Sequence, residues 1–304
     1  MSELDPNQQL MSELTPDVES LYERHMTNTK LWHPHELVPY SLGVTYQQGE
    51  EWNPHDYPLP DSLRSALYIN LLTEDNLPYY YETINSWSPS RDHPWGVWAR
   101  QWTSEEDRHS SVIREWIHVT RAIDPNLLED ARRPQLALGQ VPHPSSLPDL
   151  LAYTTLQELA TRVAHSNTGL LLDKERGGKD VMARVAADEG LHHIFYRDLS
   201  IAAFEVDPSS MVIAVAKQIR NFAMPGEGIL DFKAHANVVA DAGIYDLVKF
   251  KENVVDPTLL KWDIQSRTGL SDEAETARDG LLKHLSRLDR VIARKQRNQA
   301  ESKL

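Results

Sequence analysis

Glutamate and histidine recur twice in the same arrangement along this 304-residue chain. The first copy is Glu74 with Glu106 and His109, and the second is Glu158 with Glu189 and His192. In each copy a lone glutamate precedes a Glu-x-x-His pair, by 32 residues in the first and 31 in the second. A four-helix bundle that binds two metal ions takes one Glu from each of two helices and a Glu-x-x-His from each of the other two. The pattern therefore predicts a dinuclear metal site.

Helical phase distinguishes these two pairs from a third. Because a helix turns about 100° per residue, Glu106 and His109 share one face with large apolar residues and should be buried with them. That face also carries Trp98, Trp102, Ile113, Trp116 and Thr120. Glu115 and His118 form another Glu-x-x-His pair but project away from this face. We interpret that third pair as an ordinary solvated surface.

The other three acids of the pattern also lie among expected core residues. Stripes at helical spacing run through Leu63, Leu67, Asn70, Glu74, Leu77, Tyr81 and Ile84; through Leu147, Leu151, Thr154, Glu158, Thr161 and His165; and through Val185, Glu189, His192, Tyr196, Leu199 and Ala203. A carboxylate taken out of water must be neutralised, paired or bound to metal. Two histidines cannot balance four buried acids, whereas two divalent cations can. The alternative is that these are half-buried acids in unrelated helices, with histidines satisfied by their neighbours.

Composition narrows the chemistry and the location. The chain has no cysteine, which excludes disulfides, thiolate zinc sites and thiolate nucleophiles. Ligands limited to Glu and His favour iron or manganese. A net charge of -14 argues against nucleic acid as a partner, because phosphate binding needs a basic surface. No apolar run is long enough for a membrane span, and Met1–Pro16 lacks the Lys and Arg of a targeting peptide. We expect a cytoplasmic protein.

Amphipathic helical periods dominate the chain from Asp61 to Arg297, and strand signals are sparse. A short turn at 88–94 predicts that the first two ligand helices are antiparallel neighbours. The proline-rich stretch 134–148 predicts one long crossover, as in ferritin-like bundles. Pro78 should distort the helix that carries Glu74, because proline removes a backbone hydrogen bond. A helix start is expected at Asp61-Ser62 after Pro60, with the cap supplied by a short polar side chain. Further breaks are expected at Asp124-Pro125, Gly177-Gly178, Asp207-Pro208 and Pro225-Gly226.

These signals predict an all-α protein, a ferritin-like four-helix bundle with additional helices, in a single domain over residues 1–304. An irregular segment at 1–60, with a short helix around Pro16–His25, precedes the bundle core at about 61–205. Additional helices fill about 207–297.

Longer motifs around the six Glu and His residues make the chain resemble the soluble acyl-acyl carrier protein desaturases of plastids and actinobacteria. The likeness runs from about Trp52 to Lys249. Its motifs are Thr73-Glu74-Asp75-Asn76-Leu77-Pro78, Trp102-Thr103-Ser104-Glu105-Glu106-Asp107-Arg108-His109, Gln157-Glu158-Leu159-Ala160-Thr161, His165-Ser166-Asn167-Thr168 and Ala186-Ala187-Asp188-Glu189-Gly190-Leu191-His192. The resemblance implies that the six residues ligate two iron ions (Fe2+), with Glu106 and Glu189 bridging. The chain departs from the plant pattern at Leu159, Gly190 and Leu191, which flank ligands and replace none of them.

The resemblance also implies roles for three residues outside the ligand set. Thr161 would face the oxygen-binding side, although a threonine in a helix often bonds its own backbone instead. Asp188 would orient His109, because a metal-bound histidine usually needs a partner on its other ring nitrogen. Trp52 would stand at the outer end of an electron route through Asp188 and His109.

By the same resemblance we predict dioxygen-dependent desaturation of a fatty acyl chain on acyl carrier protein, with a ferredoxin-type electron donor and a homodimeric enzyme. The alternatives are another di-iron carboxylate oxidase or oxygenase, an iron-storage bundle, or a catalytically weak carrier-binding relative. An acidic carrier protein would need a basic docking surface. The candidate is a C-terminal stretch that could equally be a solvated tail helix: Lys283, Arg287, Arg290, Arg294, Lys295 and Arg297.

Overall fold

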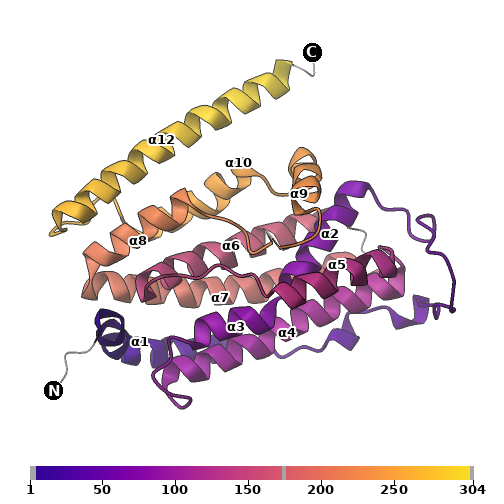
Figure 1. Cartoon of the computed structure of the whole chain (residues 1–304), viewed down its shortest axis with the longest axis horizontal. Helices are drawn as coiled ribbons and strands as arrows, with labels where there is room; N and C mark the ends of the chain where they lie inside the picture. The colour runs from indigo at the N-terminus through magenta and orange to yellow at the C-terminus, as the bar shows by residue number, and fades with distance from the viewer. Residues whose placement is uncertain (1–4, 173–175, 227, 302–304) are drawn as a thin grey trace.

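The computed structural model of the protein describes residues 5–172, 176–226 and 228–301. Within these ranges every regular element is helical, which confirms the predicted all-α class. The ferritin-like bundle consists of α2 (Asp61–Glu74) with its continuation α3 (Leu77–Asn85), α4 (Pro94–Thr120), α6 (Leu147–Leu171) and α7 (Gly178–Val206), as Figure 1 shows.

A long helix, α1 (Pro6–Asn28), precedes the bundle and packs against α7 and α4. The prediction of an irregular segment with only a short helix was therefore wrong for this part of the chain. Asp5 caps the helix by accepting a hydrogen bond from the amide of Asn7, and Pro6 stands in the first turn, where its missing amide costs nothing. Residues 29–60 are irregular except for the short helices η1 (Pro34–Glu36) and η2 (Tyr40–Leu42).

The first ligand helix ends at its acid. α2 stops at Glu74, and α3 begins three residues later at Leu77 with Pro78 in its first turn. The distortion predicted from Pro78 is thus a complete break, and proline occupies a position where no amide donor is needed. The turn before α7 depends on Gly177, whose φ of 75° is left-handed and disfavours any residue with a Cβ. A Cβ there would also lie 3.0 Å from the carbonyl oxygen of Leu37.

The crossover between the halves of the bundle is mostly helix. Asp124 caps α5 (Pro125–Leu138) by accepting from the amide of Asn126, so the predicted break at Asp124-Pro125 also starts a helix. Pro134 lies inside α5 without ending it. The irregular part of the crossover is therefore shorter than the predicted 134–148, because α6 already begins at Leu147.

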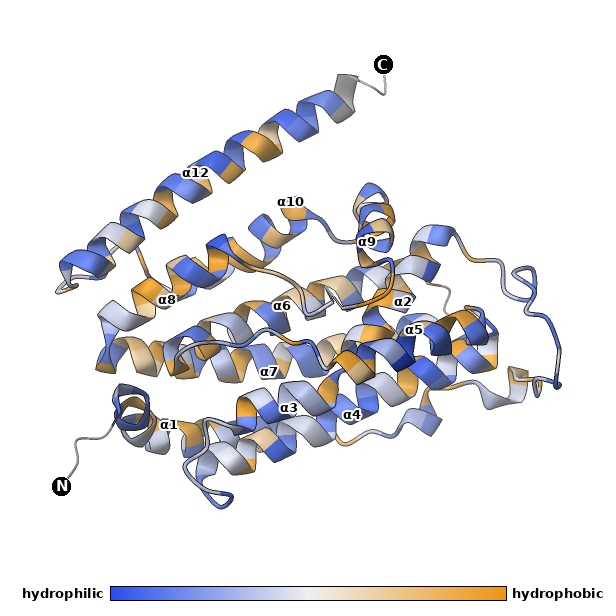
Figure 2. Ribbon diagram, viewed as in Figure 1, coloured by the Kyte–Doolittle hydropathy of each residue, from blue (hydrophilic) through white to orange (hydrophobic). Residues whose placement is uncertain are grey.

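The remaining helices cover the bundle on one side. α8 (Pro208–Arg220) packs on α6 and α7, and α9 (Phe232–Asp241) packs on α2. The chain then passes through α10 (Leu247–Phe250), the π-helical turn η3 (Lys251–Val255) and α11 (Asp256–Trp262) to α12 (Asp272–Glu301). α12 runs along the outside and contacts α8 (Figure 1). Most residues of α12 are coloured hydrophilic in Figure 2, while its Leu281 and Leu285 are buried in the core.

Among the described helices, none combines the length and the apolar character that crossing a membrane would require.

Candidate metal centre

The bundle helices bring all six predicted ligands into one buried cluster. α2 supplies Glu74 from its last residue, α4 supplies Glu106 and His109, α6 supplies Glu158, and α7 supplies Glu189 and His192. None of the six side chains belongs to a residue that is more than 6 % exposed. Helical phase therefore places each acid on the inner face of its helix, as the sequence predicts.

The cluster divides into two groups of potential ligands. One contains Glu74, Glu106, His109 and Glu189, and the other contains Glu106, Glu158, Glu189 and His192. In each group the ligand atoms lie within 4.8 Å of one another. Glu106 and Glu189 belong to both groups, which is the position that bridging carboxylates between two ions would occupy.

Both histidines turn the same ring nitrogen toward the carboxylates. The Nδ1 of His109 lies 3.1 Å from Glu106 Oε2 and 3.3 Å from Glu189 Oε1. The Nδ1 of His192 lies 2.8 Å from Glu106 Oε1. In each ring Nε2 faces outward, to Asp188 for His109 and to Glu105 for His192. The two imidazoles thus offer equivalent nitrogens to a shared centre.

The buried charges of this cluster are incompletely compensated by the protein itself. Burial, together with neighbouring acids such as Glu106, raises the pKa of Glu74 and of Glu189 well above the ordinary range. Burial also acts to raise the pKa of Glu106, but His109 and His192 outweigh it and hold that pKa below the ordinary range. Among the described residues, Glu106 Oε1, Glu158 Oε2 and Glu189 Oε1 are buried and accept no well-aligned hydrogen bond. A histidine Nδ1 lies near each of them, at 2.8, 3.6 and 3.3 Å respectively. Such carboxylate oxygens could bind hard metal cations, which prefer oxygen ligands.

Asp188 stands behind His109, as the resemblance implies. Its Oδ2 lies 3.5 Å from His109 Nε2. The same oxygen accepts a hydrogen bond of 2.7 Å from the indole of Trp32, whose ring stacks on His109 at a centroid distance of 6.5 Å. Arg184 forms an ion pair with the other oxygen. Asp188 therefore links the predicted ligand His109 to an aromatic ring and a guanidinium.

The placement predicted for Trp52 is wrong. Its indole donates to the carbonyl oxygen of Arg121, beyond the C-terminal end of α4, at 2.8 Å. Trp32 contacts Asp188 instead, because the chain leaves α1 next to α4 and α7. The length of α1 was not predicted, so nothing in the sequence placed Trp32 near the cluster.

Thr161 lies one turn beyond Glu158 on the inner face of α6. Its hydroxyl donates to the carbonyl oxygen of Gln157 at 2.6 Å and accepts from the side-chain amide of Gln157 at 2.9 Å. This is the backbone-bonded arrangement that the sequence left open as the alternative. The hydroxyl can still turn toward the cavity that Thr161 lines.

Two buried polar residues outside the predicted set contact the cluster. His165 Nε2 lies 2.8 Å from Glu74 Oε1, and burial lowers the pKa of His165 to about 3. Glu105, the neighbour of Glu106, is 1 % exposed and lies 2.9 Å from His192 Nε2. The inner-face stripe of α6 already contained His165, whereas Glu105 carried no signal beyond its place in the motif.

Glu115 and His118 remain outside the cluster, as predicted from helical phase. Both are partly exposed, and Glu115 accepts a hydrogen bond from the hydroxyl of Tyr40. Neither belongs to the groups that could hold a metal ion.

Two narrow, mainly apolar cavities lie beside α6 close to the cluster. One is lined by residues that include Tyr80, Ile84, Trp102, Leu150, Tyr153 and Gln157. The other is lined by residues that include Asn70, Thr161, Ala164, Phe232, Val239 and Tyr245. Trp102 also donates to Glu158 Oε1 at 3.1 Å, so the first cavity adjoins a predicted ligand directly.

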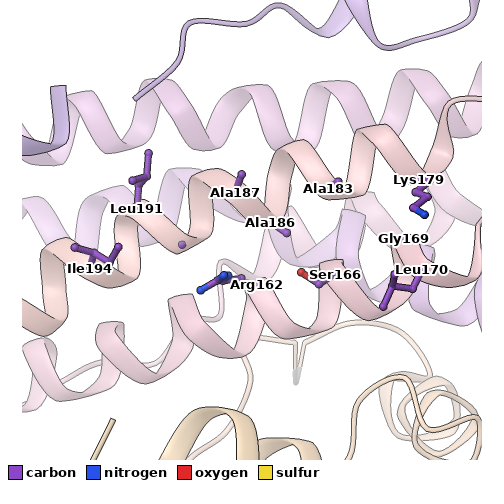
Figure 3. Close-up of a pocket in the computed structure, with 11 residues that line it drawn as sticks. Arg162, Ser166, Gly169, Leu170, Lys179, Ala183, Ala186, Ala187, Leu191 and Ile194 are labelled. Carbon is purple, nitrogen blue, oxygen red and sulfur yellow. The ribbon is translucent and has the colours of Figure 1, made fainter. Parts of the chain in front are cut away.

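A wider groove lies along α6 and α7 (Figure 3), and none of the six predicted ligands is among the residues that line it. Arg162 and Ser166 border it from α6, and Ala183, Ala187 and Leu191 border it from α7. Gly190 also lines it. Two of the three departures from the plant pattern, Gly190 and Leu191, therefore lie in this groove and not in the metal cluster.

Comparisons with known proteins agree with the geometry. A family model described as fatty acid desaturase matches residues 6–304. DesA1 of Mycobacterium tuberculosis, an acyl-acyl carrier protein desaturase by name, is 38% identical over 283 residues, which cover 90% of this chain and 83% of DesA1. The chloroplastic stearoyl-acyl carrier protein 9-desaturase of Gossypium hirsutum is 30% identical over 289 residues, covering 88% of this chain and 71% of that protein.

A solved structure supports the fold independently. The X-ray structure of DesA2 of M. tuberculosis H37Rv superposes with a TM-score of 0.71 at 24% identity, covering 88% of this chain and 99% of DesA2. At this level of identity the likeness shows a shared fold.

Proposed function

Because this chain belongs to the acyl-acyl carrier protein desaturase family of oxidoreductases, we propose that it introduces a double bond into a fatty acyl chain held on acyl carrier protein. The oxidant is dioxygen. Reduction of dioxygen to two waters takes four electrons; the two C–H bonds broken on adjacent carbons supply two, and a ferredoxin-type donor supplies the other two. The convergence of four carboxylates and two imidazoles in one buried cluster carries this proposal.

Two iron ions are the cofactor that this ligand set fits. Glu74 and His109 would hold one ion, Glu158 and His192 the other, and Glu106 and Glu189 would serve both. The ions supply the activation of dioxygen that unactivated C–H bonds require. The protein's part is to hold the ligands, to orient the acyl chain and to exclude water from the cluster.

The two apolar cavities beside α6, one of which Thr161 lines, suit an alkyl chain that has no polar groups. An alkyl chain can be positioned only by shape and apolar contact, and such pockets are lined mainly by hydrophobic and aromatic side chains. The cavity beside Trp102 and the cavity beside Ala164 both border α6 near Glu158. We propose that the acyl chain threads this region, with Thr161 on the side where dioxygen arrives.

The direct test combines metal analysis with a product assay. Purified protein should bind two iron ions per chain and convert at least one member of a panel of acylated carrier proteins to a monounsaturated product when a reduced ferredoxin is supplied. Omission of dioxygen or of the donor should abolish the product. A fully iron-loaded protein that desaturates no acylated carrier would count against the proposal, and oxidation of a different substrate would favour another di-iron oxidase.

We propose that Trp32 has the role that the family resemblance implied for Trp52. Trp32→Phe keeps an aromatic ring beside His109 but removes the 2.7 Å hydrogen bond to Asp188. Loss of a partner behind a metal ligand costs about 10- to 100-fold, so we expect turnover with a protein donor to fall by about tenfold or more. Trp52→Phe should change it little. Equal rates in both variants and the parent protein would reject the role for Trp32.

The exposed basic face of α12 is the proposed docking site for the acidic carrier. Arg287 and Arg290 are exposed, whereas Lys295 is engaged by Asp246 at 2.8 Å. Reversing Arg287 and Arg290 to Glu should weaken carrier binding several-fold at low salt and less at high salt, because exposed charges are screened. Reversal of Arg133 and Lys261, which are exposed on other helices, is the matched control. Binding that is insensitive to the α12 pair would dismiss this surface.

Three further assignments complete the proposal. We infer that residues 1–304 form a single desaturase domain, that the enzyme is cytoplasmic, and that it assembles as a homodimer. Sedimentation of the purified protein would test the oligomeric state directly.

A further inference from the structure

His25 of α1 contacts Glu105, and the carboxylate of Glu105 in turn contacts the predicted ligand His192. His25 is 4 % exposed, and its Nε2 lies 2.9 Å and 3.2 Å from the two carboxylate oxygens of Glu105. The Oε2 of Glu105 lies 2.9 Å from His192 Nε2 as well. A continuous line of polar contacts therefore runs from α1 through Glu105 to His192.

The orientation of His192 defines what this line does. Its Nδ1 faces Glu106 and Glu158, on the side of the metal cluster. If Nε2–H donates to Glu105, Nδ1 carries no proton and presents its lone pair to the cluster, as a metal ligand must. The position of the Glu105 carboxylate thus selects the tautomer and the ring orientation of His192.

Glu105 is held in place mainly by neutral donors and His25. Gln101 donates to its Oε1 at 2.7 Å, and Thr29 donates at 3.4 Å. In the described part of the chain, no Lys or Arg forms an ion pair with Glu105. Asp188, which has the corresponding place behind His109, is instead held by Trp32 and Arg184. The two predicted histidine ligands are therefore supported in different ways.

The helix that carries His25 is well fixed. Leu10, Met11, Leu14 and Val18 of α1 are buried in the same core cluster as residues of α4 and α7. The edge of the Trp98 ring system also meets the ring of His25 at a centroid distance of 5.0 Å. α1 can thus hold the imidazole in one orientation against Glu105.

We propose that His25 is a positioning residue for the metal centre: by fixing Glu105 it sets the orientation and tautomer of His192. α1 is then a part of the metal site, although none of the six predicted ligands lies on it. The inference rests on the dinuclear centre of the proposed function and adds a residue some 80 positions away in sequence from the carboxylate that it contacts.

The test is a titration of metal-free protein with Co2+, in which binding is measured from the light absorption of the bound ion. The titration compares the parent protein with three variants of His25. His25→Gln can keep a donor near the position of Nε2, whereas His25→Asn is too short and His25→Leu has no donor. We expect the parent protein and His25→Gln to bind two ions with similar affinity. His25→Asn and His25→Leu should lose about 10- to 100-fold in affinity at one of the two positions.

Two control variants separate positioning from loss of stability. Thr27→Val removes an exposed hydroxyl of α1 that donates to the carbonyl oxygen of Glu23, and it should change Co2+ affinity little. Val18→Ala weakens the packing of α1, so it should lower the unfolding temperature and leave both affinities unchanged. Two tight sites in His25→Asn and His25→Leu would overturn the proposal, as would equal losses in Val18→Ala and His25→Asn.

The titration needs no substrate. A parent protein that shows His25-dependent binding of two ions but produces no unsaturated acyl chain would contradict the proposed desaturation and support the role of His25.

Discussion

Replacing Glu106 with alanine should empty both metal positions and abolish activity. Glu106 belongs to both groups of potential ligands, and its two oxygens lie 3.1 Å from His109 Nδ1 and 2.8 Å from His192 Nδ1. Loss of a residue behind a ligand costs about 10- to 100-fold, so loss of a shared ligand should cost more than about 100-fold in affinity. Metal analysis after dialysis should find almost none of the ions that the parent protein retains.

The chain contains its own control for this experiment. Glu115 lies in the same helix and begins the same Glu-x-x-His spacing, but it is partly exposed and far around the helix from the cluster. Glu115→Ala should retain the parent metal content and activity. His192→Ala should affect mainly the group that contains Glu158. Unchanged metal content in both Glu106→Ala and His192→Ala would remove the site as described.

The contrast between Glu106 and Glu115 shows why much of this site is predictable from sequence. Position along a helix determines which face a residue occupies, and large apolar residues mark the buried face. Glu74, Glu158 and Glu189 follow from the same reasoning, because each stands in a stripe of core residues. The break at Gly177 follows from local backbone chemistry, which also needs no tertiary information. The helix starts at Asp61 as expected, but the predicted side-chain cap is wrong, because Pro60 occupies the N-cap and no side chain caps the helix.

The residues that support the ligands could not be found in this way. His25 and Trp32 reach Glu105 and Asp188 from a separate segment, and the sequence carries no local signal for a contact between segments so far apart. Trp52 and Trp32 are equivalent as single tryptophans. Only the course of the chain after α1 decides which of them meets Asp188. The underestimated length of α1 and the wrong choice of tryptophan therefore have the same cause, because both depend on contacts between segments that are distant in sequence.

Asp188→Asn should reduce turnover while the protein retains most of its bound metal. The carboxylate is 0 % exposed, lies 3.5 Å from His109 Nε2, and accepts from Trp32 at 2.7 Å. Asparagine has the same size but no charge, so it supports the His109 ring without stabilising the proton on Nε2 as strongly. We expect most of the iron to remain at saturating metal and turnover to fall by about 10- to 100-fold.

Asp107→Asn is the matched control, because Asp107 is exposed on α4 beside the same motif. It should leave turnover and metal content unchanged. If Asp188→Asn turned over at the parent rate, the charge of Asp188 would not be needed to orient His109, whose orientation would then depend on Glu106 and Glu189. A loss of turnover with metal retained would instead mean that Asp188 acts in the chemistry through His109 and is not needed to bind the ions.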